Sequence, residues 1–252
     1  MCTLEKRGRV YLLTLTGTDE HRLNPMLLDA VRSALARVRS EAAASSDGGA
    51  ALVTAAEGKF FSNGFDLAWA RASPSLRPGL MTAALHRTLA DLLSLPMPTI
   101  AAVTGHVSAA GCFLALSHDY VVMRADRGFF YMSEVDIGLP IVDSLMSVMR
   151  AKIPDPRTRR DVLLRGKKVT AAEAEARGIV DRAVVGAREA VEAAIAMGEE
   201  LAARNWDGEV YASIRKGLFK EVCKGLGLEE ASGEEAAAAA AAALTKQPSS
   251  KL

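Results

Sequence analysis

Short apolar runs, separated by turns rich in glycine and polar residues, dominate the first 140 residues of the chain. Each run has four to six residues and is rich in β-branched or aromatic side chains, which is typical of buried strands. The predicted strands are 10–15, 50–54, 99–103, 120–123 and 128–131.

Two longer segments between these runs carry apolar residues at the three- and four-residue spacing of an amphipathic helix. The first begins at Asn24-Pro25, which suit the cap and the first position of a helix, and extends to about residue 39. The second spans about 80–95 and ends before two prolines. Because strands alternate with helices, the pattern predicts an α/β core with a largely parallel sheet.

Beyond about residue 142 the pattern indicates helices only, at 157–164, 170–177 and 187–203. Thr170 and Glu173 match a capping box at the start of the second of these. The alanine-rich segment 234–243 has strong intrinsic helix propensity, and we interpret it as a spacer ahead of a polar tail. We therefore expect a core at 1–190, a C-terminal helical region at 191–244 and an exposed tail at 245–252.

Composition narrows the class of protein. The 252 residues are half hydrophobic and carry a formal net charge of +1, so electrostatics favour neither a nucleic-acid partner nor a membrane surface. No apolar run approaches the ~18–20 residues of a membrane-spanning helix, so we expect no membrane insertion. The three cysteines and the histidines show no metal-ligand spacing, and no metal site is predicted.

Three segments carry the candidate chemistry: F-F-S-N-G-F-D-L at 60–67, A-V-T-G-H-V-S-A-A-G-C at 102–112 and Y-M-S-E-V-D-I-G-L-P at 131–140. In this order and at this spacing they resemble the crotonase (enoyl-CoA hydratase/isomerase) superfamily, with its patterns F-S-x-G-x-D-L, A-x-x-G-x-x-x-G-G-G-C and P-E-x-x-x-G-x-x-P. The third segment looks especially like the plant-type peroxisomal isomerases of the superfamily. The resemblance implies a spiral of ββα units with a C-terminal helical region.

The resemblance also implies an oxyanion hole, in which the backbone N–H groups of Phe65 and Ala110 bind the thioester oxygen. Two of the three family glycines are replaced here by Ala109 and Ala110. A backbone donor survives this change where alanine can adopt the required dihedral angles. Further residues expected to contact the substrate, including its CoA moiety, are Ser62, Asn63, Gly64, Asp66, Leu67, Gly111, Arg22 and Leu23. Lys216 and Lys220 are further candidates for contacting CoA from the C-terminal helices.

Glu134 falls on the acid of the third pattern and is the expected catalytic base. Apolar neighbours at 132, 137, 139 and 141 are expected to desolvate its carboxylate and raise its pKa toward the range useful for proton transfer. Hydratases of the superfamily carry a second acid just after the Gly-Cys pair, where this chain has Phe113. One carboxylate suffices to move a double bond, because it can take a proton from C2 and return it to C4.

The expected reaction is therefore conversion of 3-enoyl-CoA, cis or trans, into trans-2-enoyl-CoA in fatty-acid β-oxidation, with CoA as part of the substrate and no separate cofactor. A dienoyl-CoA isomerase is an alternative, in which Asp136 or Asp143 would assist; the family's second carboxylate corresponds to Val142. An enoyl-CoA hydratase and a non-catalytic acyl-CoA-binding relative are also compatible with these residues.

The sequence ends in Ser250-Lys251-Leu252, a tripeptide read by the peroxisomal import receptor. We expect this receptor as a partner and the peroxisome as the location. The resemblance further implies a homotrimer or a hexamer.

Overall fold

The computed structural model describes residues 1–17, 19–45 and 48–228. The predicted alanine-rich helix at 234–243, the tail at 245–252 and the import tripeptide lie outside the described residues.

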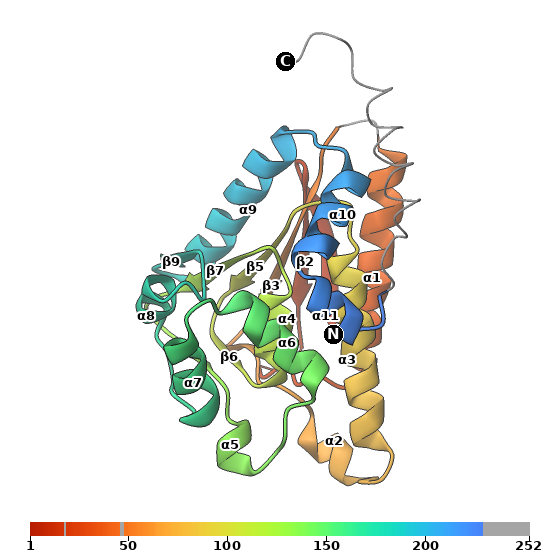
Figure 1. The fold of residues 1–252 in the computed structure, drawn as a ribbon. Coiled ribbons are helices and arrows are strands. Elements are labelled where there is room, and N and C mark those ends of the chain that lie inside the picture. The colour runs from red at the N-terminus through yellow and green to blue at the C-terminus, as the bar shows by residue number, and fades with distance from the viewer. Residues whose placement is uncertain (18, 46–47, 229–252) are drawn as a thin grey trace.

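A six-stranded sheet runs through the molecule in the order β1-β2-β3-β5-β7-β9 (Figure 1). Its strands are β1 (Cys2–Arg7), β2 (Val10–Leu15), β3 (Ala51–Ala56), β5 (Thr99–Val103), β7 (Tyr120–Arg124) and β9 (Arg182–Val184). Only the β1–β2 pair within this sheet is antiparallel. A largely parallel sheet confirms the predicted α/β class.

A smaller parallel sheet, in the order β4-β6-β8, branches from the first. Its strands β4 (Phe60–Ser62), β6 (His106–Ser108) and β8 (Phe130–Tyr131) follow directly after β3, β5 and β7 along the chain. Each pair of strands then leads into a helix: α2 (Leu67–Arg71), α4 (Ala110–Leu116) or α5 (Glu134–Ile137). This threefold repeat is the spiral of ββα units that the family resemblance implied.

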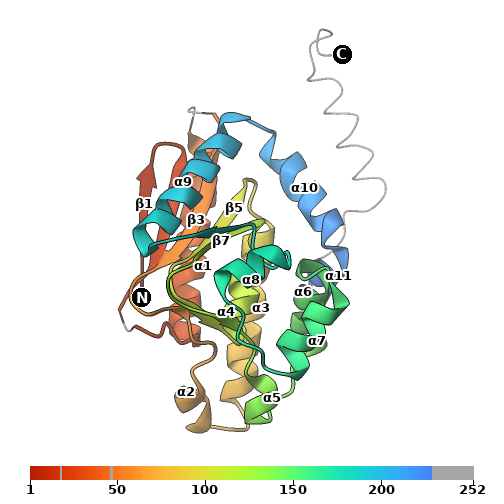
Figure 2. The ribbon, with the colours of Figure 1, turned by 90° about the vertical axis from the view of Figure 1, so that its left-hand side faces the viewer.

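Two hydrophobic layers bury the two faces of the large sheet. Helices α1 (Pro25–Ala44), α3 (Arg77–Leu93) and α4 pack on one face, and α9 (Ala187–Ala203) covers the other, as Figures 1 and 2 show. Alternate residues of β2 point to the two layers, so that Leu13 lies in the first and Leu12 in the second. Helix α9 approaches closely because it presents small residues; a Cβ at Gly198 would lie 3.0 Å from Val10 Cγ2.

The sequence patterns located five of the eleven helices among the described residues. Asn24 caps α1 by accepting a hydrogen bond from the Leu27 amide (3.0 Å), with Pro25 in the first turn. The capping box of Thr170 and Glu173 opens α8 (Ala171–Ala176). The remaining helices are α6 (Asp143–Lys152), α7 (Pro156–Leu164), α10 (Gly208–Leu218) and α11 (Lys220–Gly225). No helix among the described residues is both long and apolar enough to cross a membrane.

The expectation of helices alone beyond residue 142 was wrong, because β9 extends the large sheet beside β7. This strand has only three residues, begins with an exposed arginine and lies at the edge of the sheet, so its sequence lacks an apolar run. The predicted boundary between residues 190 and 191 falls within α9, a helix that packs on the sheet.

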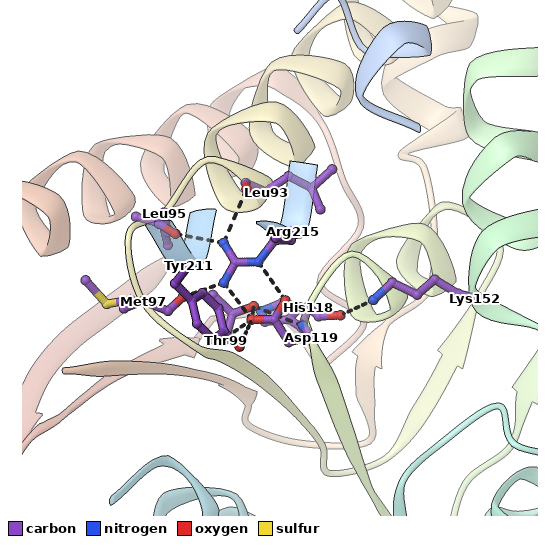
Figure 3. A network of polar contacts seen from close by, with 9 residues as sticks. All are labelled: Leu93, Leu95, Met97, Thr99, His118, Asp119, Lys152, Tyr211 and Arg215. Carbon is purple, nitrogen blue, oxygen red and sulfur yellow. Dashed lines mark hydrogen bonds and ion pairs between the residues drawn. The ribbon is translucent and has the colours of Figure 1, made fainter. Parts of the chain in front are cut away.

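A buried ion pair fastens the C-terminal helices to this core. Arg215 of α10 is 3% exposed, and it donates to Asp119 through Nε (2.6 Å) and Nη2 (2.6 Å). Its guanidinium also donates to the carbonyl oxygens of Leu93, Leu95 and Met97, at the end of α3 and in the turn before β5 (Figure 3). Helix α11 follows α10 and packs against α6.

Candidate active site

The three sequence segments meet at one edge of the small sheet. Its parallel strands pair in the registers Ser62 with Val107 and Ser108 with Tyr131. The turns after β4, β6 and β8 therefore leave the sheet side by side, at the carboxyl ends of its strands, which is where ligands bind in open α/β sheets. Phe65, Ala110 and Glu134 lie in or directly after these three turns.

The turn after β4 leaves the Phe65 amide free for a ligand. Gly64 has a φ of +72°, which an L residue rarely adopts. The Gly64 carbonyl accepts from the Leu23 amide (2.8 Å), and the Asp66 amide donates to the Leu23 carbonyl (2.9 Å). The Phe65 N–H lies between these two bonds along the chain and has no acceptor among the described residues.

The turn after β6 presents the second amide. Ala110 is the first residue of α4, and its N–H has no acceptor among the described residues. A Cβ at Gly64 would lie 3.3 Å from the Ala110 nitrogen and 2.7 Å from Ala109 Cβ, so the two turns are in contact. Two amides without acceptors among the described residues, on turns that touch each other, are the groups that the predicted oxyanion hole requires.

The replacement of family glycines by alanine has different consequences at the two positions. Ala110 is an ordinary helical residue. Ala109 has a φ of +52° and a ψ of −127°, a region that glycine enters easily and alanine does not. A backbone of this kind costs about 1–3 kcal/mol and persists only where its surroundings hold it.

Glu134 is the first residue of α5 and is partly buried. Its Oε2 atom is buried and has no hydrogen-bond partner among the described residues. Burial raises the pKa of the Glu134 carboxyl, and the nearby amides of Glu134 and Ser133 oppose that shift. A carboxylate oxygen without a partner is available to accept a proton from a bound molecule.

The side chains that surround Glu134 differ in part from those expected. Met132 is fully buried, whereas Ile137 and Leu139 are 51% and 43% exposed and do not form the apolar enclosure that the sequence suggested. The Cys112 thiol of α4 is also buried, and its pKa is raised mainly by that burial and to a smaller extent by the charge of Glu134. Cys112 was not among the expected site residues, although its position after Gly111 places it in the helix that carries the second amide.

The carboxylates weighed as helpers to Glu134 are both exposed, and their assistance stays a prediction. The Asp143 side chain is 89% exposed and pairs with Arg150 (3.0 Å). Asp136 is also exposed, and its Oδ2 lies so close to Gly166 that a Cβ there would be 2.8 Å away. Phe113 is buried in α4.

The other predicted substrate residues lie in several different environments. Leu23, Ser62 and Gly111 are buried and hold the turns together; the Ser62 hydroxyl, for example, donates to the His21 carbonyl (2.8 Å). Arg22 is half-exposed and pairs with Glu20 (2.6 Å).

Asn63 and Asp66 are also committed to bonds within the protein. Asn63 joins Ser108 and Glu20, and Asp66 caps α2 by accepting from the Trp69 amide (2.9 Å). Leu67 begins α2. Contact of these residues with substrate stays a prediction, as does contact of Lys216 and Lys220 with CoA. No cluster of histidine, cysteine, aspartate and glutamate suited to a metal ion occurs among the described residues.

Comparison with known proteins gives consistent results. The pattern of the family described as enoyl-CoA hydratase/isomerase matches residues 6–240. Enoyl-CoA delta isomerase 1, peroxisomal, of Arabidopsis thaliana is 56% identical over 222 residues, which cover 88% of this chain and 91% of the relative. Enoyl-CoA delta isomerase 2, peroxisomal, and enoyl-CoA delta isomerase 3 from the same plant are 53% and 52% identical, covering 91% and 90% of this chain and 96% of each relative.

Solved structures share the fold at lower identity. An enoyl-CoA hydratase from Mycobacterium ulcerans has a TM-score of 0.78 at 23% identity, covering 90% of this chain and 96% of that one. DspI of Pseudomonas aeruginosa has a TM-score of 0.81 at 20% identity, covering 98% and 96%.

Proposed function

The chain belongs to the enoyl-CoA hydratase/isomerase family, and we propose that it is an enoyl-CoA delta isomerase that converts 3-enoyl-CoA, cis or trans, into trans-2-enoyl-CoA. The observation that carries the reaction type is Glu134, a partly buried carboxyl whose buried Oε2 has no partner among the described residues, on a turn beside the two turns that carry free backbone amides. Phe113 stands where hydratases of the family carry a second acid. The names of three relatives at 52–56% identity support the same reaction.

In the proposed mechanism the thioester oxygen accepts hydrogen bonds from the Phe65 and Ala110 amides, which makes the C2 protons more acidic. Glu134 takes one proton from C2, and the electron pair of that C–H bond forms a C1–C2 double bond, which gives a dienolate that keeps its C3–C4 double bond. The C2–C3 double bond of the product forms in the second step, when C4 is protonated and the thioester carbonyl is restored. The negative charge comes to lie largely on the thioester oxygen, where the two amides stabilise it. Glu134 then returns its proton to C4, so that atoms and charge balance without a cofactor.

Two features of the glutamate suit this cycle. The unpartnered Oε2 loses no existing hydrogen bond when it accepts the proton. Its raised pKa makes the protonated form easier to reach, and the same proton must be held until C4 is ready to receive it. The apolar Phe113 supplies no group that could activate water for addition to the double bond.

The substrate's CoA moiety needs a binding surface of its own. We place Arg22 there as a phosphate partner, because its half-exposed guanidinium lies in the segment whose next residue, Leu23, is bonded to the Gly64 turn. A CoA phosphate would replace Glu20 as the ion-pair partner of Arg22. CoA would then be bound by the segment that is hydrogen-bonded to the loop carrying Phe65.

We further propose assembly as a homotrimer or hexamer. Helix α10 exposes a row of apolar residues, namely Trp206 just before it, Val210, Ile214 and Leu218, at 42–72%. A row of this kind on a helix surface is typical of a protein–protein interface. Sedimentation of the purified protein tests this, and a monomer at micromolar concentration would contradict it.

We also propose a peroxisomal location, supported by the two relatives named as peroxisomal. The expected signal, Ser250-Lys251-Leu252, lies outside the described residues. Deleting these three residues from a fluorescent fusion, with the fluorescent protein at the amino end, should leave an active enzyme in the cytosol. Import of the deleted protein would show that another signal operates.

The reaction itself is tested by giving the purified protein 3-hexenoyl-CoA and, separately, trans-2-hexenoyl-CoA. Isomerisation of the first with negligible hydration of the second is expected. Efficient hydration of the second would contradict the single-acid mechanism, because a further proton-transfer group would then be needed. Turnover of neither compound would contradict the proposed function.

A further inference from the structure

A side-chain hydrogen bond links the two turns that carry the oxyanion amides. The Ser108 hydroxyl donates to Asn63 Oδ1 at 2.8 Å. Asn63 lies two residues before Phe65, and Ser108 lies two residues before Ala110. Ser108 is 1% exposed and Asn63 is half-buried, so the bond is partly shielded from water.

Asn63 is itself held from the other side. Its backbone amide donates to the Glu20 carbonyl (2.8 Å), and its Nδ2 donates to Glu20 Oε1 (3.2 Å). With both ends of the amide engaged, the side chain has one orientation, and Oδ1 is fixed in place for Ser108. A fixed acceptor can position its donor, whereas a freely rotating one cannot.

The residue that needs positioning is Ala109. Its backbone has the positive φ described above, and the residue stands between Ser108 and the Ala110 amide. Three contacts hold it: the Ser108–Asn63 bond before it, its own N–H to the Tyr131 carbonyl (3.1 Å), and its carbonyl accepting from the Cys112 amide (2.9 Å). If Ala109 relaxed toward ordinary alanine dihedral angles, the peptide that carries the Ala110 N–H would rotate away from Phe65.

We propose that Asn63 and Ser108 form a positioning clamp that holds Ala109 in its strained conformation and so keeps the Ala110 amide directed at the thioester oxygen. The proposal rests on the proposed isomerase function and adds two positioning residues to it. Both residues stand at positions that the family patterns leave open, and they accompany an alanine where the pattern has glycine. A glycine at 109 would adopt the same dihedral angles without strain, and the clamp would then matter less.

The test is a set of variants in two backgrounds. Asn63→Ala and Ser108→Ala are each made in the natural chain and in Ala109→Gly, and kcat, KM and melting temperature are measured for 3-hexenoyl-CoA. In the natural background each variant should lower kcat by about 10- to 100-fold, while KM changes less than about threefold, because the amide acts mainly in the transition state. In the Ala109→Gly background each should lower kcat by less than about threefold relative to Ala109→Gly alone.

Two controls separate positioning from general damage. The Asn63→Ala/Ser108→Ala double variant should be no slower than Asn63→Ala alone, since Asn63→Ala already removes the bond to Ser108 together with the Asn63–Glu20 bond. Ser33→Ala removes an exposed hydroxyl that bonds the Asp29 carbonyl, and should leave kcat unchanged. Because Ser108→Ala removes a single oxygen atom, it gives a folded protein to measure even if Asn63→Ala does not.

A kcat within threefold of the natural chain for Ser108→Ala would overturn the proposal. So would an equal loss in both backgrounds, because the bond would then be structural and unrelated to Ala109. Failure of the natural chain to isomerise 3-hexenoyl-CoA would instead refute the proposed function. In that case the melting temperatures still test the clamp, since the loss on Ser108→Ala should be smaller with glycine at 109.

Discussion

Replacing Arg215 with methionine should destabilise the fold far more than replacing any ordinary surface arginine. The guanidinium is 3% exposed and donates five hydrogen bonds, two to the Asp119 carboxylate and three to backbone carbonyls. Methionine fills much of the same volume but donates none. The Asp119 charge would then stay in a largely buried site with only its remaining donors, the Thr99 amide and hydroxyl and the Tyr211 hydroxyl.

The expected cost follows from this imbalance. Removing one partner of a buried ion pair costs about 3–5 kcal/mol, because the other charge is left without compensation. Three carbonyl oxygens lose a donor as well, although water that enters beside the shorter side chain would satisfy some of them. We therefore expect a loss of about 4 kcal/mol in the free energy of unfolding, a large share of the ~5–15 kcal/mol typical of a domain.

Urea denaturation followed by circular dichroism measures this loss, with Lys216→Met on the same helix as the matched control. Lys216 is only partly buried, and its replacement should cost less than about 0.5 kcal/mol. Adding Asp119→Asn to Arg215→Met should recover part of the loss, because it removes the uncompensated charge. A cost below about 1 kcal/mol for Arg215→Met would refute the view that this ion pair fastens the C-terminal helices to the core.

Further predictions concern the site and the small sheet. Glu134→Gln should raise the melting temperature at pH 7, because the pKa of Glu134 is raised in the folded state and its ionisation therefore destabilises the fold as the pH rises through that pKa. The increase in melting temperature should shrink at lower pH and vanish below the pH range in which an ordinary glutamate titrates. In the natural chain, kcat/KM should fall on the acid side with a midpoint above that of an ordinary glutamate; a midpoint at or below it would contradict the desolvated base. Gly64→Ala should lower kcat by about 100-fold or more in steady-state assays, because its Cβ would lie 3.3 Å from the Ala110 nitrogen; near-normal turnover would contradict the oxyanion hole. Gly105→Ala should prevent stable folding or cost several kcal/mol in denaturation, since its Cβ would lie 2.2 Å from the Lys59 carbonyl; full stability would contradict the close approach of β4 and β6.

Sequence patterns predicted those elements that are buried enough to show a run or a regular spacing of apolar residues. Strands β2, β3, β5 and β7 are mostly buried, and each appears in the sequence as an apolar run. The first strand was missed because it lies at the sheet edge, is largely exposed, and reads C-T-L-E-K-R. Strands β4 and β6 have three residues each, too few for any period to show.

The site was predictable to the extent that family patterns mark its residues. Those patterns singled out Glu134 and the two glycine-rich turns, but they could not reveal the backbone of Ala109 or the bond between Asn63 and Ser108. Both depend on the pairing of β4, β6 and β8, which brings together residues about 45 positions apart in the sequence. The exposure of Ile137 and Leu139 was likewise not predictable, because local composition does not show which side chains of such a short segment face the solvent.

The central claim is that one carboxyl, Glu134, moves the proton between C2 and C4. The most direct test compares isomerisation of 3-hexenoyl-CoA by the natural chain and by Glu134→Gln, with acyl-CoA binding measured by calorimetry for both. The account predicts that kcat falls by about 10²- to 10⁴-fold or more while the dissociation constant changes only a few-fold. Turnover by Glu134→Gln within tenfold of the natural chain would contradict it, because another group would then be carrying the proton.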